Sequence, residues 1–324
     1  MRKLIHVKRL GFWSSSALVA VAMQMSAAQA AQITWNASYF NDVGLSASDF
    51  NKFQANVNTT LNYYTSTWSA PNAVTIKIEF HAGNTGLGTT TSYYAPVGYQ
   101  AYRNALATTG TSADDATALA FLPNAANNPT NGNTQVSMSL PLQRAMGLSN
   151  IMPPGADPDS SVVLNTTLMT IDRADPIAPG TYDLQQVVYH ELNEVIGFTS
   201  GLNGVPNNPI TVPAGAIQPA DLWRYRGVGL RSFTSDPNEA CYFSINNGVT
   251  NLANYNTSDG GDRQDFNGLP NPSVQDAFST PDIRLNNALA EETFIDVIGY
   301  NRVPEPAGLG LLALSAIALV RKRR

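Results

Sequence analysis

Cysteine is scarce in this chain: Cys241 is the one cysteine among 324 residues. A single cysteine excludes an internal disulfide, and we find no motif that would make it part of a cysteine-based site. The fold must therefore be held by side-chain packing, with a bound metal ion as the other available cross-link. We expect Cys241 to be an inert buried thiol.

Other signatures are also missing. The chain has no nucleophile elbow of the G-x-S-x-G kind and no glycine-rich phosphate loop, which argues against the corresponding hydrolases and nucleotide-binding enzymes. It has no internal repeat of solenoid period and no heptad pattern. Histidine is rare, with three in the whole chain, and two of these, His81 and His190, lie beyond the first thirty residues.

The first thirty residues have the three parts of a secretory signal peptide. Four basic residues come first, an apolar stretch follows at 17–23, and Ala28-Gln29-Ala30 supplies the small residues of a cleavage site. We expect signal peptidase to cut between Ala30 and Ala31. An uncleaved anchor is disfavoured, because the apolar stretch is shorter than the roughly 20 residues that a spanning helix needs.

The C-terminus carries a second targeting signal. Pro304, Glu305 and Pro306 precede an uncharged apolar run at 307–320, and four basic residues follow. This tail resembles the PEP-CTERM sorting signal, which implies processing by an exosortase in a Gram-negative bacterium that makes extracellular polysaccharide. The resemblance implies transient membrane contact through the tail, and a final location in the outer envelope or the extracellular matrix. The alternative is a plain membrane anchor with a positive flank.

Removing both ends leaves an acidic protein. The basic count falls from 19 to about 11 while about 23 acidic residues remain, so the net charge is about −12. Such a surface argues against nucleic acid as a partner. Roughly 270 residues remain, enough for one large domain or two small ones. We expect a signal peptide at 1–30, an N-terminal subdomain at 31–200, a C-terminal subdomain at 201–302 and the sorting signal at 303–324.

Periodicity predicts both helices and strands in the mature chain. Apolar residues three and four apart predict a helix over 50–64, and alternation predicts a half-exposed strand over Val74–His81. The remaining patterns predict helices at 99–106 and after Ser112, strands at 136–140 and 161–164, and a hairpin joining 242–245 to 249–250 through Asn247-Gly248.

The segment Leu184–Ile196 has the clearest helical pattern, and it carries the chemistry. Within it His190, Glu191 and Glu194 form a HExxE motif that Gly197 closes. Residues four apart share one helix face, so His190 and Glu194 can bind one metal ion, while Glu191 points beside it. The alternative is a polar stripe on a buried helix, although buried charges are costly unless they are paired.

The motif and the segments after it resemble secreted metalloproteases of the zincin type, many of which carry PEP-CTERM tails. The resemblance rests on the HExxE helix, on 219–225 (Pro-Ala-Asp-Leu-Trp-Arg-Tyr), on 242–245 and on 296–300. It implies an α+β zincin-like fold, with a twisted mixed sheet, an active-site helix and a loop-rich C-terminal part. The strand Val74–His81 would be the edge strand over the cleft. No methionine follows Met169, so the Met-turn of metzincins is absent.

For the third metal ligand we select Asp221, because it follows the helix by one loop and lies in the specific 219–225 match. A turn residue or a salt-bridge partner of Arg224 is an equal alternative, and Glu291, Glu292 and His81 are weaker candidates. Asp259, Asp262 and Asp265 in a glycine-rich loop suit calcium, although a solvated acidic loop is the simpler interpretation.

The sequence thus predicts a zinc-dependent peptide hydrolase acting on a peptide or protein substrate. Glu191 would be the general base, and a hydroxyl or cation such as Tyr225 or Arg224 would assist. The alternative is a non-catalytic surface or biofilm matrix protein on the same scaffold. Histidine with carboxylates would also bind manganese or iron.

Overall fold

The computed structural model describes residues 31–148, 157–203, 217–268 and 271–303. The predicted signal peptide, including Ala30, and the sorting signal from Pro304 onward lie outside the described residues. In the described ranges no helix is both long enough and apolar enough to cross a membrane.

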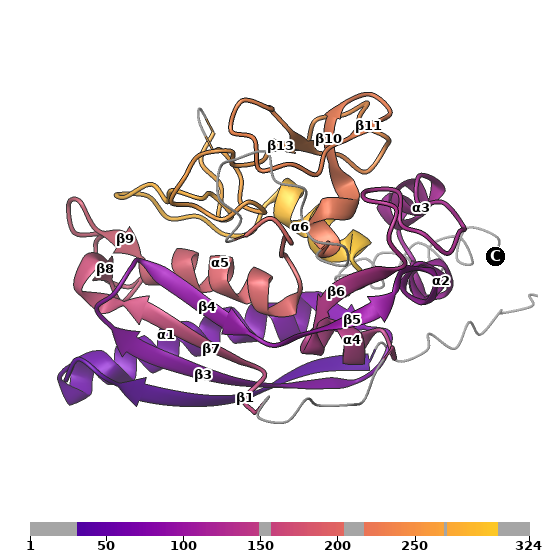
Figure 1. The fold of residues 1–324 in the computed structure, drawn as a ribbon. Helices are drawn as coiled ribbons and strands as arrows, with labels where there is room; N and C mark the ends of the chain where they lie inside the picture. Colours follow the sequence, from indigo (N-terminus) through magenta and orange to yellow (C-terminus); the bar gives the residue numbers. More distant parts are fainter. Residues whose placement is uncertain (1–30, 149–156, 204–216, 269–270, 304–324) are drawn as a thin grey trace, which may run out of the picture.

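The largest element is a mixed sheet of six strands, so the α+β fold class is confirmed (Figure 1). Its central strands run parallel, and β4 lies antiparallel to β7 at one end. In spatial order the strands are β14 (Asn301–Arg302), β2 (Trp68–Ala70), β1 (Ala31–Asn41), β3 (Val74–Gly83), β7 (Ser160–Asn165) and β4 (Gly88–Ser92).

One face of this sheet is covered by two helices. Val74, Ile76 and Ile78 of β3 are buried, and the residues between them point to the exposed face. Helices α1 (Ala47–Thr67) and α5 (Leu184–Ile196) contact each other, and they pack respectively on β1 and on β7 and β4. The predicted helix at 50–64 is therefore confirmed as part of α1.

The structure corrects the predicted role of the strand Val74–His81. This strand forms, but it lies inside the sheet, with β1 on one side and β7 on the other. Alternating burial shows that one face of a strand is covered, and it carries no information on how many strands flank it. Among the described residues the strand that ends the sheet beside α5 is β4.

A smaller layer flanks one end of the sheet. It contains a two-stranded ribbon and three helices: β5 (Tyr94–Gly98), α2 (Tyr99–Thr109), α3 (Ala113–Ala120), β6 (Gln135–Ser139) and α4 (Leu140–Ala145). The predicted helices at 99–106 and after Ser112 are present, and the predicted strand at 136–140 is present except for Leu140, which begins α4. A parallel pair of two-residue strands, β8 (Met169–Thr170) and β9 (Tyr182–Asp183), leads into α5. The start of α5 is thereby fixed by backbone pairing.

The C-terminal part has little regular structure. A short 3-10 helix (Pro219–Trp223) precedes a four-stranded sheet in the order β11 (Leu230–Arg231), β10 (Arg224–Gly227), β12 (Tyr242–Phe243) and β13 (Ala253–Asn254). The predicted hairpin is wrong, because β12 pairs with β10 and β13 instead of 249–250. Asn247 and Gly248 do form a turn with positive φ, which the Tyr242 hydroxyl closes by bonding to the Gly248 carbonyl.

Helix α6 (Leu289–Val297) joins this part to the rest of the protein. It packs against α3 and α5, and β14 after it pairs with β2 of the first sheet. At the α3–α6 contact Asp296 accepts a hydrogen bond of 2.5 Å from Ser112, while its other oxygen is buried and has no partner among the described residues. Burial raises the pKa of Asp296 to about 7.

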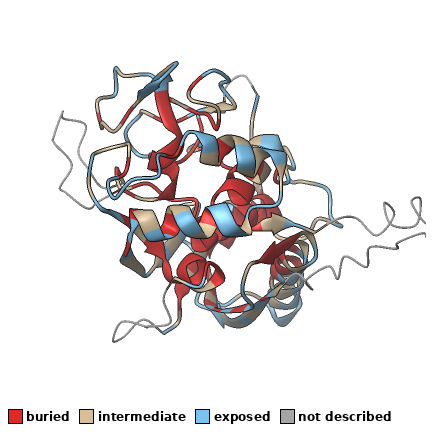
Figure 2. Cartoon of the chain, turned by 90° about the vertical axis from the view of Figure 1, so that its right-hand side faces the viewer, coloured by how far each residue is buried: buried red, intermediate tan, exposed pale blue. Residues whose placement is uncertain are grey.

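One hydrophobic core runs through both parts. Phe198, at the end of α5, contacts Phe266 and Phe294, and Phe243 contacts both of these rings. Buried residues accordingly fill the centre of the molecule, and exposed residues lie on the outer helices and loops (Figure 2). In Figure 1 α5 lies between the six-stranded sheet and the C-terminal part.

Candidate metal centre

Helix α5 begins and ends where the sequence predicts, for local reasons. The Asp183 side chain caps it by accepting a hydrogen bond of 3.0 Å from the Gln186 amide, and Arg173 forms an ion pair with the same carboxylate. Gly197 ends the helix at φ 128°, a conformation that favours glycine. Every residue of α5 except His190 is buried, so its polar side chains are held within the protein.

Three side chains converge beside this helix: His190, Glu194 and Asp265. One ligand atom from each lies within 4.8 Å of the others. The Nε2 atom of His190 is 3.8 Å from a Glu194 oxygen and 3.6 Å from Asp265 Oδ2. Asp265 is 3% exposed and Glu194 is also buried. A partly buried imidazole with two buried carboxylates at this spacing could hold a metal ion.

A backbone contact orients His190 for this role. Its Nδ1 lies 3.0 Å from the carbonyl oxygen of Val274, so that nitrogen carries the proton and donates it. The Nε2 lone pair then faces Glu194 and Asp265. Histidines that bind metals almost always have their second ring nitrogen fixed in this way.

The electrostatics of the cluster favour a cation. Burial raises the pKa of Glu194 well above its ordinary value, and the charges of Glu191 and Asp265 raise it further. Burial also raises the pKa of Asp265 to about 7. Burial lowers the pKa of His190, but the charges of Asp265, Glu191 and Asp262 and the Val274 hydrogen bond together outweigh burial and raise the pKa. Without a cation the cluster therefore retains protons that a metal ion would displace.

Glu191 lies next to this group, against the edge strand β4. Its Oε2 accepts a hydrogen bond of 2.6 Å from the Thr90 hydroxyl, and Thr90 also reaches its backbone carbonyl. Gly88 makes room for it, because a Cβ there would lie 2.1 Å from Glu191 Oε1. Burial raises the pKa of Glu191. Glu191 is thus held near the cluster without belonging to it.

Asp221 is not part of the cluster, and this corrects the predicted third ligand. Its carboxylate accepts hydrogen bonds from the Ser200 hydroxyl and from the amides of Gly201 and Gln218, at 2.6, 2.8 and 2.9 Å. It also lies 3.8 Å from Arg224, which matches the alternative interpretation of a turn and ion-pair residue. These partners occupy Asp221 in closing the loop after α5.

The weaker ligand candidates are also engaged elsewhere. Glu291 accepts hydrogen bonds from the amides of Gln275 and Ala288. Other candidates have surface partners: Glu292 pairs with Arg302 at 2.7 Å, and His81 with Asp42 at 2.7 Å. Tyr225 and Arg224, named as possible assisting groups, are both buried, and Arg224 donates to the Cys241 sulfur at 2.8 Å. The prediction that Cys241 is buried is confirmed.

The three aspartates of the acidic loop that would suit calcium lie in different environments. Among the described residues Asp259, Asp262 and Asp265 are not brought together as ligands, because Asp259 is largely exposed beside Arg263 while Asp265 points inward to His190. The sequence did mark this acidic loop as a metal candidate. The signal that could have separated Asp265 from its neighbours is the adjacent Phe266, a core residue that draws the end of the loop inward.

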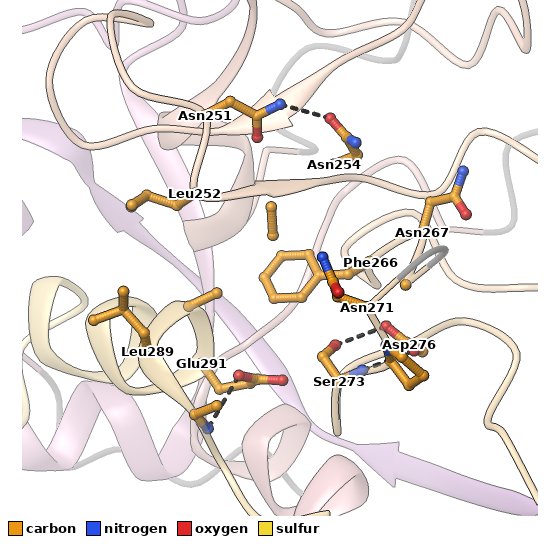
Figure 3. Close-up of a pocket in the computed structure, with 15 residues that line it drawn as sticks. Asn251, Leu252, Asn254, Phe266, Asn267, Asn271, Ser273, Asp276, Leu289 and Glu291 are labelled. Carbon is orange, nitrogen blue, oxygen red and sulfur yellow. Dashed lines mark hydrogen bonds between the residues drawn. The ribbon is translucent and has the colours of Figure 1, made fainter.

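A cavity of about 420 Å³ is lined by residues 251–254, 266–268, 271–273 and 288–291 and by Asp276 (Figure 3). Ser273 and Asp276 line it, and they are hydrogen-bonded to each other. Between them, Val274 bonds to His190 and Gln275 bonds to Asp265. The segment 273–276 therefore separates the cavity from the candidate metal centre.

The donor set fits a divalent transition metal. Zinc accepts imidazole nitrogen and carboxylate oxygen and commonly keeps an open position when three protein ligands bind it, although manganese and iron accept the same donors. Comparison of the chain with family models, with curated proteins and with solved structures gives no match. The case for the site therefore stands on its geometry.

Proposed function

We propose that this protein is a metal-dependent peptide hydrolase, with zinc as the metal, on a zincin-like scaffold. The observation that carries the proposal is the convergence of three side chains, His190 and Glu194 from α5 and Asp265 from a loop. Glu191, also on α5, is held beside them by Thr90. When bound, zinc supplies a Lewis acid that polarises a peptide carbonyl and makes water a better nucleophile.

Glu191 is the general base of the proposed reaction. It accepts the proton of the attacking water and then passes it to the amine that leaves. The hydrogen bond from Thr90 fixes its carboxylate, and burial raises its pKa above the ordinary value, which makes the carboxylate a stronger base.

The substrate would be a peptide in an extended conformation. Strand β4 ends the sheet among the described residues, and its Thr90 contacts Glu191 directly. An extended peptide that adds to this edge places its backbone beside the proposed base. The expected export signals imply a substrate outside the cytoplasm and a final location of the protein in the envelope or the extracellular matrix.

The test compares the mature protein with Glu191→Gln. We expect the wild type to contain about one zinc per chain by elemental analysis and to cleave an unstructured protein such as casein. Glu191→Gln should retain the zinc and lose at least a hundredfold in cleavage rate, which is the usual contribution of a general base. Equal cleavage by both proteins would rule out the proposed role of Glu191. A zinc-loaded wild type without any cleavage would favour the non-catalytic surface protein.

A further inference from the structure

A buried chain of hydrogen bonds runs from helix α1 to the candidate ligand Asp265. The Tyr64 hydroxyl donates to Asn193 Oδ1 at 2.6 Å, and Asn193 Nδ2 donates to Gln275 Oε1 at 3.0 Å. Gln275 Nε2 then donates to Asp265 Oδ1 at 2.9 Å. All four residues are buried, and Tyr64, Asn193 and Gln275 are each fully so.

The direction of this chain follows from its Asp265 end. A carboxylate that binds a metal ion is ionised and only accepts hydrogen bonds, so the amide nitrogen of Gln275 must face Asp265 and its oxygen must face Asn193. Asn193 then presents its nitrogen to Gln275 and its oxygen to the Tyr64 hydroxyl. Asn287 completes the group by exchanging hydrogen bonds of 3.1 Å with Asn193 and donating to Tyr64.

The chain ends at the metal centre, and this distinguishes it from a network that only fills the core. Gln275 occupies Oδ1 of Asp265 and leaves Oδ2 facing His190 Nε2 at 3.6 Å. The same Gln275 nitrogen is 3.5 Å from His190 Nε2, so the amide lies between two of the three candidate ligands. Val274, the residue before it, holds the other nitrogen of His190.

We propose that Asn193 and Gln275 are positioning residues of the metal centre. Asn193 fills one of the two unspecified positions of the HExxE motif, and its side chain holds Gln275, which aims one oxygen of Asp265 at the metal. Gln275 thereby holds a ligand from a loop distant in the sequence beside the two ligands on α5. The proposal rests on the metal site of the proposed function and is independent of peptide cleavage.

The chain also offers a matched control. Gln143 is another buried glutamine, 1% exposed, whose amide nitrogen donates two hydrogen bonds, to the carbonyls of Ala95 and Met138. None of its partners is a candidate ligand. Gln143→Met therefore removes the same kind of group as Gln275→Met, and a purely structural role would affect both variants alike.

The experiment measures zinc affinity by competition with a chromophoric chelator for wild type, Gln275→Met, Asn193→Leu and Gln143→Met. Loss of a group that orients a ligand costs about 10–100-fold in metal affinity, so we expect that range for Gln275→Met and a change in the same direction for Asn193→Leu. Gln143→Met should bind zinc as the wild type does. The double variant Asn193→Leu/Gln275→Met should be no weaker than Gln275→Met, because both changes break one chain.

The outcomes separate this proposal from the proposed function. A wild type that binds no zinc would overturn both. A wild type that binds zinc while Gln275→Met matches Gln143→Met would overturn the positioning role alone. If Gln275→Met does not fold, Tyr64→Phe removes only the hydroxyl that begins the chain. Unchanged zinc affinity and an unchanged visible spectrum of the cobalt-loaded Tyr64→Phe protein would then overturn the proposal.

Discussion

Two buried aspartates compete for the role of third ligand, and exchanging each for asparagine separates them. Asp265 is 3% exposed and Asp221 is 0% exposed, so the two substitutions are matched in burial and in chemistry. In Asp265→Asn the amide can still bond to Gln275, but a neutral amide oxygen is a poor ligand for zinc. In Asp221→Asn the groups that can lose a hydrogen-bond acceptor are the Ser200 hydroxyl and the Gly201 amide, which follow α5.

The magnitudes follow from linkage between binding and folding. Zinc at a hundred times its dissociation constant stabilises the folded protein by about 2.7 kcal/mol. In a domain of this size 1 kcal/mol shifts the melting temperature by roughly 2–4 °C, so zinc should raise it by about 5–10 °C. We expect Asp265→Asn to lose this rise. Asp221→Asn should lose about 3–5 kcal/mol of stability, because it leaves the buried Arg224 without its carboxylate, and it should retain the rise.

Thermal denaturation followed by circular dichroism, with zinc and with chelator, measures both quantities. For each variant we compare the melting temperature with zinc and the melting temperature with chelator. Their difference is the effect of zinc, because the loss of stability caused by the substitution itself lowers both temperatures. A zinc-dependent rise that survives in Asp265→Asn and disappears in Asp221→Asn would refute the site described above. It would also restore the ligand that the sequence predicted.

Two further predictions concern groups outside the ligand set. Burial in the folded state raises the pKa of Asp296 from 3.8 to about 7. Protonated Asp296 therefore adds up to about 4 kcal/mol to the free energy of unfolding at low pH, and this contribution is lost as pH rises through 7. Urea denaturation should therefore show Asp296→Asn with a flatter stability profile between pH 4 and 8, and an unchanged profile would contradict the assignment. Gly88→Ala should cost about 1–3 kcal/mol and reduce peptide cleavage, because the new methyl would lie 2.1 Å from Glu191 Oε1 and 2.6 Å from Val187. Gly98→Ala, which meets no atom within 4 Å, is its control, and equal losses in the two would contradict the clash.

The parts of the site that the sequence predicted are those encoded locally. The apolar spacing of α5, its aspartate cap and its closing glycine lie within fifteen residues, so the helix and the shared face of His190 and Glu194 could be read directly. The placement of Glu191 beside that face follows from the same helical geometry.

The third ligand could not be read in this way. Asp221 and Asp265 both follow α5 in loop-rich sequence, and choosing between them requires knowing how that sequence folds back. Phe266 anchors the Asp265 loop among the aromatic rings of the core, whereas Asp221 closes a local turn. The one local signal, Phe266 next to Asp265, indicates that this end of the loop is buried, and it does not show which element the loop packs against.

The edge strand of the sheet could not be identified from the sequence for a related reason. Strand β1 was not predicted, although its residues alternate, and it flanks the strand that was expected at the edge. The true edge, β4, is a short run of threonine and serine after a glycine-rich loop, and it has no apolar alternation of its own. Its position follows from pairing with β7, about seventy residues later in the sequence.

A chain with one cysteine has no covalent means of restraining its irregular C-terminal part. A metal ion shared by His190 and Asp265 would join points about 75 residues apart, as a disulfide would in an oxidised extracellular protein. By the chain-entropy model a link across such a loop removes about 4 kcal/mol of freedom from the unfolded chain. The candidate metal centre would then serve as a reversible cross-link, so that a chelator should make the described C-terminal part, from residue 217, susceptible to an added protease before the six-stranded sheet unfolds.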